Sequence, residues 1–285
     1  MQRFTSGVAL TVMVMVGACG GTPSEESAAP APGNPVEVKA LQALRQTAPR
    51  DAIAGLEAYV SKYPTDPQGH WQLASAILAT VPALARSHTD AERAEMERAA
   101  QHARKVAELS GDQSLRAAAY MQLTNIYGPL MLARPAEVVE PAKQLIAMSA
   151  TLDAPHSLLA EALADLKRID EAVQVWSDAL NTLRGRDRRQ IAVGISSFAD
   201  RRPELTEAHI RTLVAVLRTV AEDVENPDPR AHAVALILQA NRLEKDPAAR
   251  RALLQQAAPW TALADQQNQK SLDELKAAIK ELERR

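Results

Sequence analysis

The stretch DAIAGLEAYVSKYPTDPQGHWQLASAI, from Asp51 to Ile77, decides the fold. Apolar residues recur at helical spacing on both sides of the run Pro64 to Pro67, which ends one helix and begins the next. The inner positions combine large and small side chains: Ala52, Leu56 and Tyr59 before the turn, and Leu73, Ala74 and Ile77 after it. Small residues let two helices approach where they cross, and large neighbours fill the gaps around them. The stretch therefore predicts two antiparallel, closely packed helices.

A second stretch of the same kind, PHSLLAEALADLKRIDEAVQVWSDAL, runs from Pro155 to Leu180. Its inner positions are Leu159, Ala160, Leu163, Ala172, Trp176 and Ala179, with a short turn from Lys167 to Asp170 between the helices. A looser helix lies between the two stretches, with Tyr120, Leu123, Thr124 and Tyr127 inside. Its partner, at about 136–150, has Val138, Ala142 and Leu145 as inner residues.

These two stretches resemble the tetratricopeptide repeat (TPR), whose period is about 34 residues. The resemblance covers about residues 36–184, with two clear units, two degraded ones, and an insertion near a longer helix from about Thr89 to Ser110. A lone helix pair cannot bury its apolar face, so several pairs must stack. The resemblance thus implies an all-α, right-handed solenoid of stacked antiparallel helix pairs.

Residues 187–285 are interpreted as degenerate helical repeats without a clean match to the family. We expect helix 187–199 to pair with 205–224, and helix 229–243 with 247–257. A last helix from about Ser271 to Glu283 carries one apolar stripe: Leu272, Leu275, Ile279 and Leu282. A polar outer face is what a capping helix requires, and a short coiled coil is the alternative.

The N-terminus predicts export and lipid attachment. Arg3 precedes an apolar run from Val8 to Val16, and Gly17-Ala18 precede Cys19, the only cysteine in the chain. This order resembles a bacterial lipoprotein signal peptide, residues 1–18, ending in a lipobox. A thiolate at Cys19 is nucleophilic enough to accept a diacylglyceryl group. The alternatives are an ordinary signal peptide with an incidental cysteine, or a short membrane anchor.

Residues 19–35 predict a disordered tether from the lipidated Cys19. Residues 20–35 carry four prolines and no apolar periodicity, so they cannot bury enough surface to offset ordering entropy. Two acyl chains, as in palmitate-bearing lipoproteins, hold a protein durably at a membrane. In this lipoprotein class, Gly20 in place of aspartate favours the periplasmic side of a cell outer membrane. A host without an outer membrane would carry the protein on the outer face of the cytoplasmic membrane.

Composition and motifs point away from catalysis and nucleic acid. The formal net charge is −2, too near neutral for a polyanion binder. None of the six histidines falls in a zinc-binding motif, and no glycine-rich phosphate loop is present. We therefore expect no catalytic residue, no metal site, no cofactor and no enzyme activity.

The TPR resemblance implies that first helices line a concave groove. The groove positions in this register are Gln68, Trp71, Ser75, Met121, Asn125, Ser157, Glu161 and Asp165. Trp71 is either an anchor for a partner on the open face or packed under the first helix or the tether. Some TPR proteins bind the C-terminal carboxylate of a partner with a set of Lys, Asn and Arg residues. Of this set, only Asn125 is in place here.

A basic stretch from Arg184 to Arg189, with Arg201 and Arg202 further on, is either a solvated loop balanced by nearby acids or a contact for anionic lipid or an acidic partner. The hypothesis from these features is a lipid-anchored, exported scaffold or assembly factor that binds a protein or peptide of the cell envelope. An anchored enzyme or activator of envelope or polymer metabolism is the alternative, and a structural spacer is a third possibility.

Overall fold

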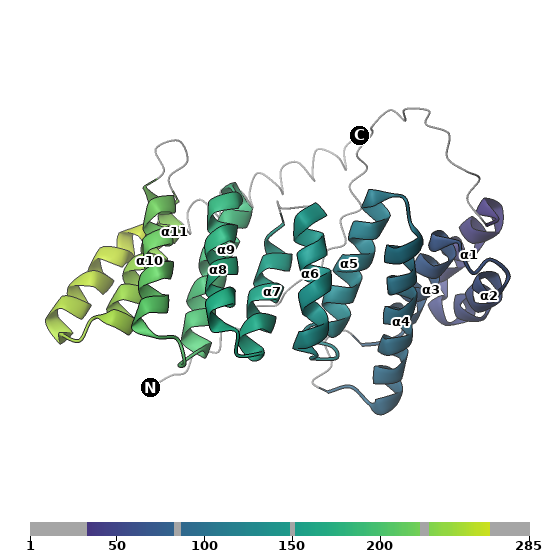
Figure 1. Cartoon of the computed structure of the whole chain (residues 1–285), viewed down its shortest axis with the longest axis horizontal. Helices are drawn as coiled ribbons and strands as arrows, with labels where there is room; N and C mark the ends of the chain where they lie inside the picture. Colours follow the sequence, from purple (N-terminus) through teal and green to yellow (C-terminus); the bar gives the residue numbers. More distant parts are fainter. Residues whose placement is uncertain (1–32, 83–86, 149–151, 223–227, 263–285) are drawn as a thin grey trace. The chain divides into compact units, whose positions relative to one another are not determined.

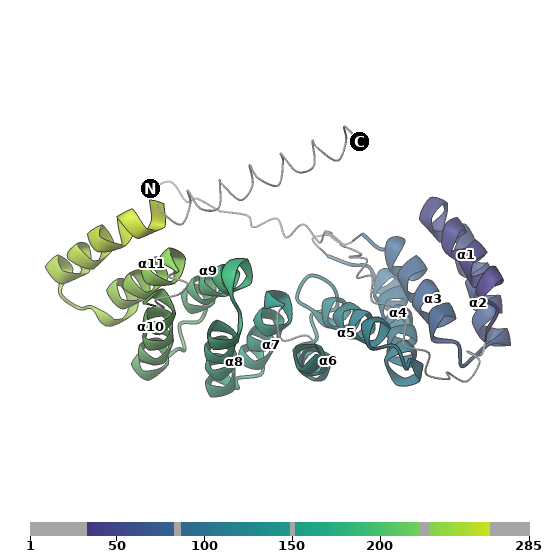
Figure 2. The same cartoon turned by 90° about the horizontal axis from the view of Figure 1, so that it is seen from above.

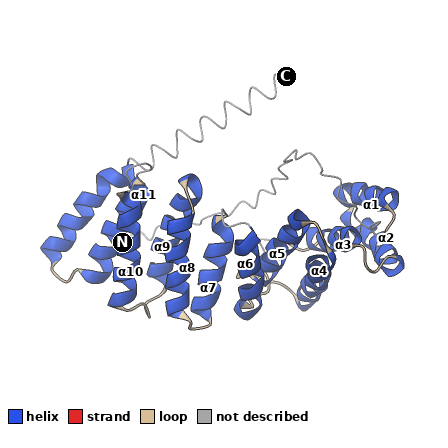
Figure 3. Cartoon of the chain, turned by 45° about the horizontal axis from the view of Figure 1, so that its top comes forward, coloured by secondary structure: helices blue, strands red, loops and turns tan. Residues whose placement is uncertain are grey.

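The computed structural model describes residues 33–82, 87–148, 152–222 and 228–262. Every regular element in these residues is a helix (Figure 3), and each helix from α1 to α9 packs against the next along the chain (Figure 1). The helices are α1 (Pro35–Thr47), α2 (Pro49–Lys62), α3 (Pro67–Ala79), α4 (Asp90–Leu109), α5 (Gln113–Tyr127), α6 (Pro135–Met148), α7 (Asp153–Asp165), α8 (Ile169–Thr182), α9 (Gly185–Arg201), α10 (Glu207–Ala221) and α11 (Pro229–Leu238). A π-helical turn (Gln239–Leu243) continues α11, and residues 247–262 are again helical. The predicted all-α solenoid is confirmed.

Side chains cap the helices where the sequence has polar punctuation. Asn34, Asp66, Asp112 and Asp228 each accept hydrogen bonds from backbone N–H groups of the helix that follows. These groups have no partner within the helix, and caps of this kind are worth about 1 kcal/mol each. Three of the four helices also begin with proline, which lacks the N–H group that would need a partner. Local sequence therefore decides where these helices start.

The predicted inner residues form the core. All twelve that come from the two clear stretches are at most 3% exposed: Ala52, Leu56, Tyr59, Leu73, Ala74, Ile77, Leu159, Ala160, Leu163, Ala172, Trp176 and Ala179. In the looser pair Tyr120 is only partly buried, while its predicted companions Leu123, Thr124, Tyr127, Val138, Ala142 and Leu145 are buried. The predicted register of these helices is confirmed.

The turn between α7 and α8 is shorter than expected. Ile169 and Asp170 already belong to α8, so Leu166 to Arg168 make the connection. Lys167 adopts φ 62°, the left-handed conformation that lets a helix end and the chain reverse within a few residues.

The expected hairpin of α9 with α10 is wrong. The two helices touch only slightly, whereas α10 packs on α8 and α11, and α9 packs on α7, α8 and α11 (Figure 2). Helix α10 buries a stripe of five large apolar residues: Ile210, Leu213, Val214, Leu217 and Val220. Because α8 and α11 both offer apolar surface, burying this stripe between them removes more of it from water than one partner would.

Residues 1–32 and 263–285 lie outside the described part, and with them the predicted signal peptide, Cys19, most of the tether and the expected last helix. Residues 33–35 of the expected tether belong to the folded body. The backbone N–H of Asn34 donates to the hydroxyl oxygen of Tyr59 at 2.8 Å, and this hydroxyl donates to Asp66 at 2.5 Å. Within the described residues, none of the helices combines the length and the apolar character that a membrane crossing needs.

Candidate functional site

The eight predicted groove residues lie on α3, α5 and α7, and we call them together the first-helix surface. None of the eight is buried: Gln68, Asn125 and Asp165 are exposed, and Trp71, Ser75, Met121, Ser157 and Glu161 are partly exposed. On each helix they stand three or four residues apart, which places them on one side. Apart from the partly buried Leu158, the apolar side chains between these positions are buried, so each helix separates a core side from an accessible side.

Two of the three helices that carry this surface contact one another directly. Helix α5 packs on α7 as well as on α6, and α7 packs on α9 as well as on α8. The accessible sides of α5 and α7 therefore belong to neighbouring helices within the same stack, which is the arrangement that a binding surface built on rigid elements requires.

Trp71 has an intermediate position. Its side chain is partly exposed, so it is neither fully open to solvent nor packed away from it. Its neighbours on α3, Gln72 and Leu73, are buried. A large indole that keeps part of its surface accessible provides apolar contact area to a partner at a low entropy cost.

Glu161 and Asp165 already have partners within the chain. Glu161 accepts hydrogen bonds from Arg201 at 2.5 Å and from Arg202 at 2.9 Å, and Asp165 accepts one from Arg202 at 2.5 Å. Partial burial opposes the charge of Arg202, but the hydrogen bonds to these carboxylates raise its pKa. These ion pairs tie α7 to the C-terminal end of α9, so a partner of these two carboxylates must compete with them.

The basic stretch is the start of α9 and not a solvated loop, because Gly185, at φ 55°, begins the helix directly after Arg184. Arg184 donates to the carbonyls of Asn181 and Leu183, and the buried Arg188 donates to that of Leu183 at 2.7 Å. These guanidinium groups satisfy carbonyls at the end of α8, which a helix leaves without internal partners. The expectation that nearby acids balance the basic side chains is confirmed for Arg201 and Arg202, which both pair with Glu161.

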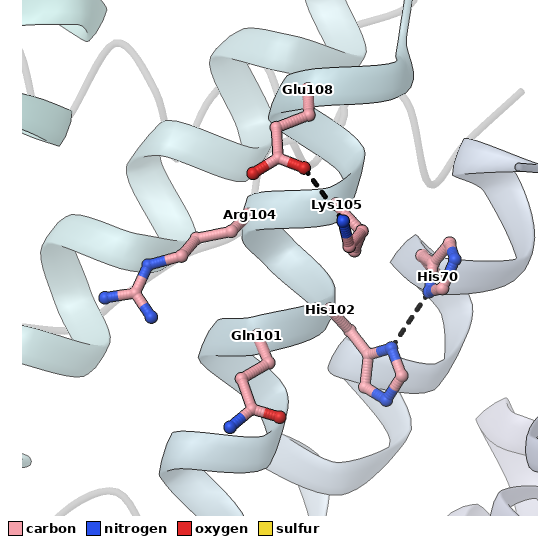
Figure 4. A pocket seen from close by; sticks show the side chains of 6 residues that line it. All are labelled: His70, Gln101, His102, Arg104, Lys105 and Glu108. Atoms are coloured by element: carbon pink, nitrogen blue, oxygen red, sulfur yellow. Dashed lines mark hydrogen bonds and ion pairs between the residues drawn. The ribbon is translucent and has the colours of Figure 1, made fainter. Parts of the chain in front are cut away.

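A pair of histidines that the sequence reasoning missed meets between α3 and α4. The Nδ1 atoms of His70 and His102 lie 2.9 Å apart, and the Nε2 atom of His70 lies 2.9 Å from the carbonyl oxygen of Pro64 (Figure 4). Burial, together with the electrostatic effects of the neighbouring His70 and Arg98 side chains, lowers the pKa of His102 to about 4. The pair borders an open cavity of about 390 Å³, whose other lining residues are Gln101, Arg104, Lys105 and Glu108.

No short sequence motif predicts this pair of histidines. The two residues are 32 positions apart in the sequence. Histidines that bind one metal ion from the same helix are usually separated by only three to five residues. Only the packing of α3 on α4 brings them together. Within the described ranges, no group of three or more His, Cys, Asp or Glu side chains is placed to hold a metal ion.

Comparisons with known proteins give this chain no family. No protein-family model matches it, and no curated protein matches it in sequence.

Proposed function

We propose that this protein is a lipid-anchored, exported scaffold or assembly factor with TPR-like helix pairs, which binds a protein or peptide partner at the periplasmic face of an outer membrane. The observation that carries the proposal is the first-helix surface. All eight of its residues keep access to solvent while their neighbours on the same helices form the core. A solenoid that holds accessible side chains on stacked helices is suited to binding an extended partner.

The composition of the surface supports a protein partner. Trp71 and Met121 provide apolar area, while Gln68, Asn125 and Ser157 provide hydrogen-bonding groups. Aromatic residues and methionine are enriched in the cores of protein interfaces, and neutral polar groups orient a partner without a large desolvation cost. The ion pairs of Glu161 and Asp165 stiffen the α7 end of the surface.

Membrane attachment rests on Cys19 and its apolar leader. The prediction is that a Cys19→Ser chain moves from the membrane fraction to the soluble periplasmic fraction, because it lacks the thiol that accepts the lipid. Quantitative fractionation measures this change. A Cys19→Ser chain that stays in the membrane fraction contradicts lipid anchoring and leaves the partner proposal to be tested separately.

The partner proposal is tested by crosslinking in the native cell envelope followed by mass spectrometry. We expect Trp71→Ala to reduce at least one reproducibly captured protein severalfold, because an aromatic anchor contributes much of an interface's binding energy. Trp260→Ala is the matched control, since Trp260 is 38% exposed but lies outside the first-helix surface. An identical set of captured proteins from the parent and Trp71→Ala chains contradicts the proposed surface.

A further inference from the structure

Helix α1 exposes an apolar stripe to solvent. The stripe consists of Val36, Ala40, Ala43, Leu44 and Thr47, which recur at the spacing of one helix face. Val36, at 76%, is the most exposed large apolar residue among the described ones. The hydroxyl of Thr47 donates to the carbonyl of Leu44 at 3.2 Å, so it needs no partner outside the helix. The opposite side of α1, with the buried Val38, packs on α2 and α3 (Figure 2), which leaves the stripe open to an outside surface.

The charges on α1 favour a lipid surface as that partner. The exposed residues of α1 include one charged group, Lys39 at the border of the stripe, and none of them is acidic. Glu37 stands on the other flank, where its carboxylate lies 3.9 Å from the ammonium group of Lys62 on α2. At a bilayer surface, the stem of a lysine lies along the apolar region while its ammonium group reaches anionic headgroups. The stripe and Lys39 therefore match the interface of a bilayer.

The start of α1 is fixed at the point where the predicted tether ends. The backbone N–H of Asn34 donates to the hydroxyl oxygen of Tyr59 at 2.8 Å, and this hydroxyl donates to Asp66 at 2.5 Å. The side chain of Asn34 accepts a hydrogen bond from the N–H of Val36 at 3.1 Å. A side chain at Gly33 would collide with the Asp66 carboxylate, so the backbone passes close to the α2–α3 turn. The folded body is thus held firmly directly before the stripe.

The length of chain before α1 limits its distance from a lipid on Cys19. Cys19 and Gly33 are 14 positions apart in the sequence, so their Cα atoms are separated by at most about 50 Å. Val36 follows only three residues later. Two large aliphatic side chains bind a bilayer weakly on their own, but a lipid anchor at this distance makes the contact intramolecular and raises the effective concentration of lipid at the stripe.

We propose that the exposed stripe of α1 lies on the lipid surface to which Cys19 anchors the chain. This inference rests on the lipid anchoring in the proposed function and adds a second contact with the membrane. None of the stripe residues belongs to the first-helix surface, so membrane contact and partner binding use different residues.

The test uses the full lipidated chain in vesicles of about three parts phosphatidylethanolamine to one part phosphatidylglycerol. Because the lipid occupies the only native cysteine, the thiol of Val36→Cys is the only one that can take an environment-sensitive fluorophore. We expect its emission to shift to the blue on vesicles, and nitroxide-bearing lipids to quench it at least about twofold more than the same fluorophore at Leu130→Cys. Leu130 is the matched control because it is 55% exposed and lies outside α1.

A second set of variants tests the stripe without a fluorophore at Val36. A fluorophore at Ala40→Cys should lose its quenching by nitroxide lipids when Val36→Glu and Leu44→Glu are added, because carboxylates resist transfer from water into the apolar part of the interface. Val193→Glu with Leu254→Glu is the matched control pair, since these residues are 40% and 38% exposed outside α1. This pair should leave the quenching unchanged. Unchanged quenching in the α1 variant would contradict the proposal.

Co-sedimentation with the vesicles separates this inference from the proposed function. If the chain sediments but iodide quenches the Val36 fluorophore as strongly as the Leu130 fluorophore, the stripe faces water and the inference is overturned while the anchoring stands. If the Val36 fluorophore is shielded from both iodide and nitroxide lipids, protein covers the stripe, as in a dimer, and the inference is also overturned. A lipidated chain that does not sediment with vesicles contradicts the anchoring itself and this inference with it.

Discussion

The helices α1 to α8 and the residues from α9 onward use the same element but are held together in different ways. In the first region each helix packs on the next, and fully buried alanines such as Ala52, Ala160 and Ala172 lie among large apolar residues. In the second region α10 leaves its neighbour α9 and packs between α8 and α11. There, arginine side chains bond to the ends of helices.

Arg242 illustrates the second kind of contact. From the π-helical turn after α11, its guanidinium group donates to the backbone carbonyls of Ala199, Arg202 and Leu205, around the end of α9. One planar group with several N–H donors thus reaches the carbonyl of Ala199 in the last turn of α9, which the helix leaves without a partner, and two carbonyls of the segment that follows the helix. Apolar packing therefore runs through both regions, and single arginine contacts to the ends of helices are added where the pairing of successive helices fails.

Trp176 lies where the two regions meet, so its removal should have the largest effect. It is 1% exposed on α8, its ring centroid lies 5.7 Å from that of Phe198 on α9, and a side chain at Gly194 would collide with it. We expect Trp176→Ala to lower the free energy of unfolding by about 3–5 kcal/mol in denaturant titrations. The exposed Trp260→Ala should cost less than about 1 kcal/mol. Equal midpoints for the two variants would show that the junction is not a packed core.

Removing the arginine contact tests the second region alone. Arg242→Met keeps the apolar stem but leaves three carbonyls without this donor, and we expect a loss of about 2–3 kcal/mol. Hydrogen exchange should accelerate in α9 and α11 and change little in α1 to α4, because a solenoid is stabilised locally. Arg250→Met, which removes one exposed hydrogen bond to Asn241, is the control. Uniform acceleration along the whole chain would contradict the division into two regions.

Overpacking a crossing tests the first region. Ala160 is completely buried on α7, so Ala160→Leu forces α7 away from its neighbours and should cost about 1–3 kcal/mol. Ala154→Leu adds the same atoms to an exposed position of the same helix and should leave the thermal midpoint nearly unchanged. A parent-like midpoint for Ala160→Leu would mean that this crossing can expand without loss.

Apolar periodicity made the first region predictable. Alternation of small and large residues identified the buried sides of α2, α3, α7 and α8, and those positions are the core. The eight first-helix positions were predicted by the same register, and their accessibility follows from it. Both results depend on which side of one helix a residue occupies, which sequence spacing determines.

Polar contacts between helices were not predictable in this way. His70 and His102 meet because α3 packs against α4, and Arg188 donates to the carbonyl of Leu183 because the start of α9 lies beside the end of α8. Such contacts depend on where a neighbouring helix ends and on how it is rotated. For the same reason the sequence did not predict the packing of α10 on α8. The apolar stripe on α10 shows that the helix is covered, but it does not indicate which helix covers it.

The pH dependence of stability should separate the two regions further. The folded protein protonates His102 only below about pH 4, whereas the unfolded chain does so below about pH 6.5. The unfolded state therefore binds more protons between these values, and stability should fall as the pH falls through this window. Because the ring is partly exposed, solvent screening limits the expected loss to about 1–2 kcal/mol.

Denaturant titrations at about pH 7 and about pH 4.5 measure this loss. His102→Asn should reduce it, and His209→Asn, in the second region, should leave this contribution in place. Equal losses in the parent and His102→Asn chains would exclude His102 as the source.

The smallest expected effect concerns the turn between α7 and α8. Lys167 has φ 62°, a backbone conformation that costs a residue with a side chain about 1 kcal/mol or more and that glycine adopts freely. Part of the gain from Lys167→Gly is lost to the greater freedom of the unfolded chain, so we expect a net stabilisation of about 0.5 kcal/mol. Lys143→Gly, inside α6, should destabilise by about 1 kcal/mol, which gives the control the opposite sign. Destabilisation by Lys167→Gly would mean that the ion pair of the Lys167 side chain with Glu204, at 3.8 Å, contributes more than the backbone conformation of Lys167 costs. Charge would then also help to join the first region to the second.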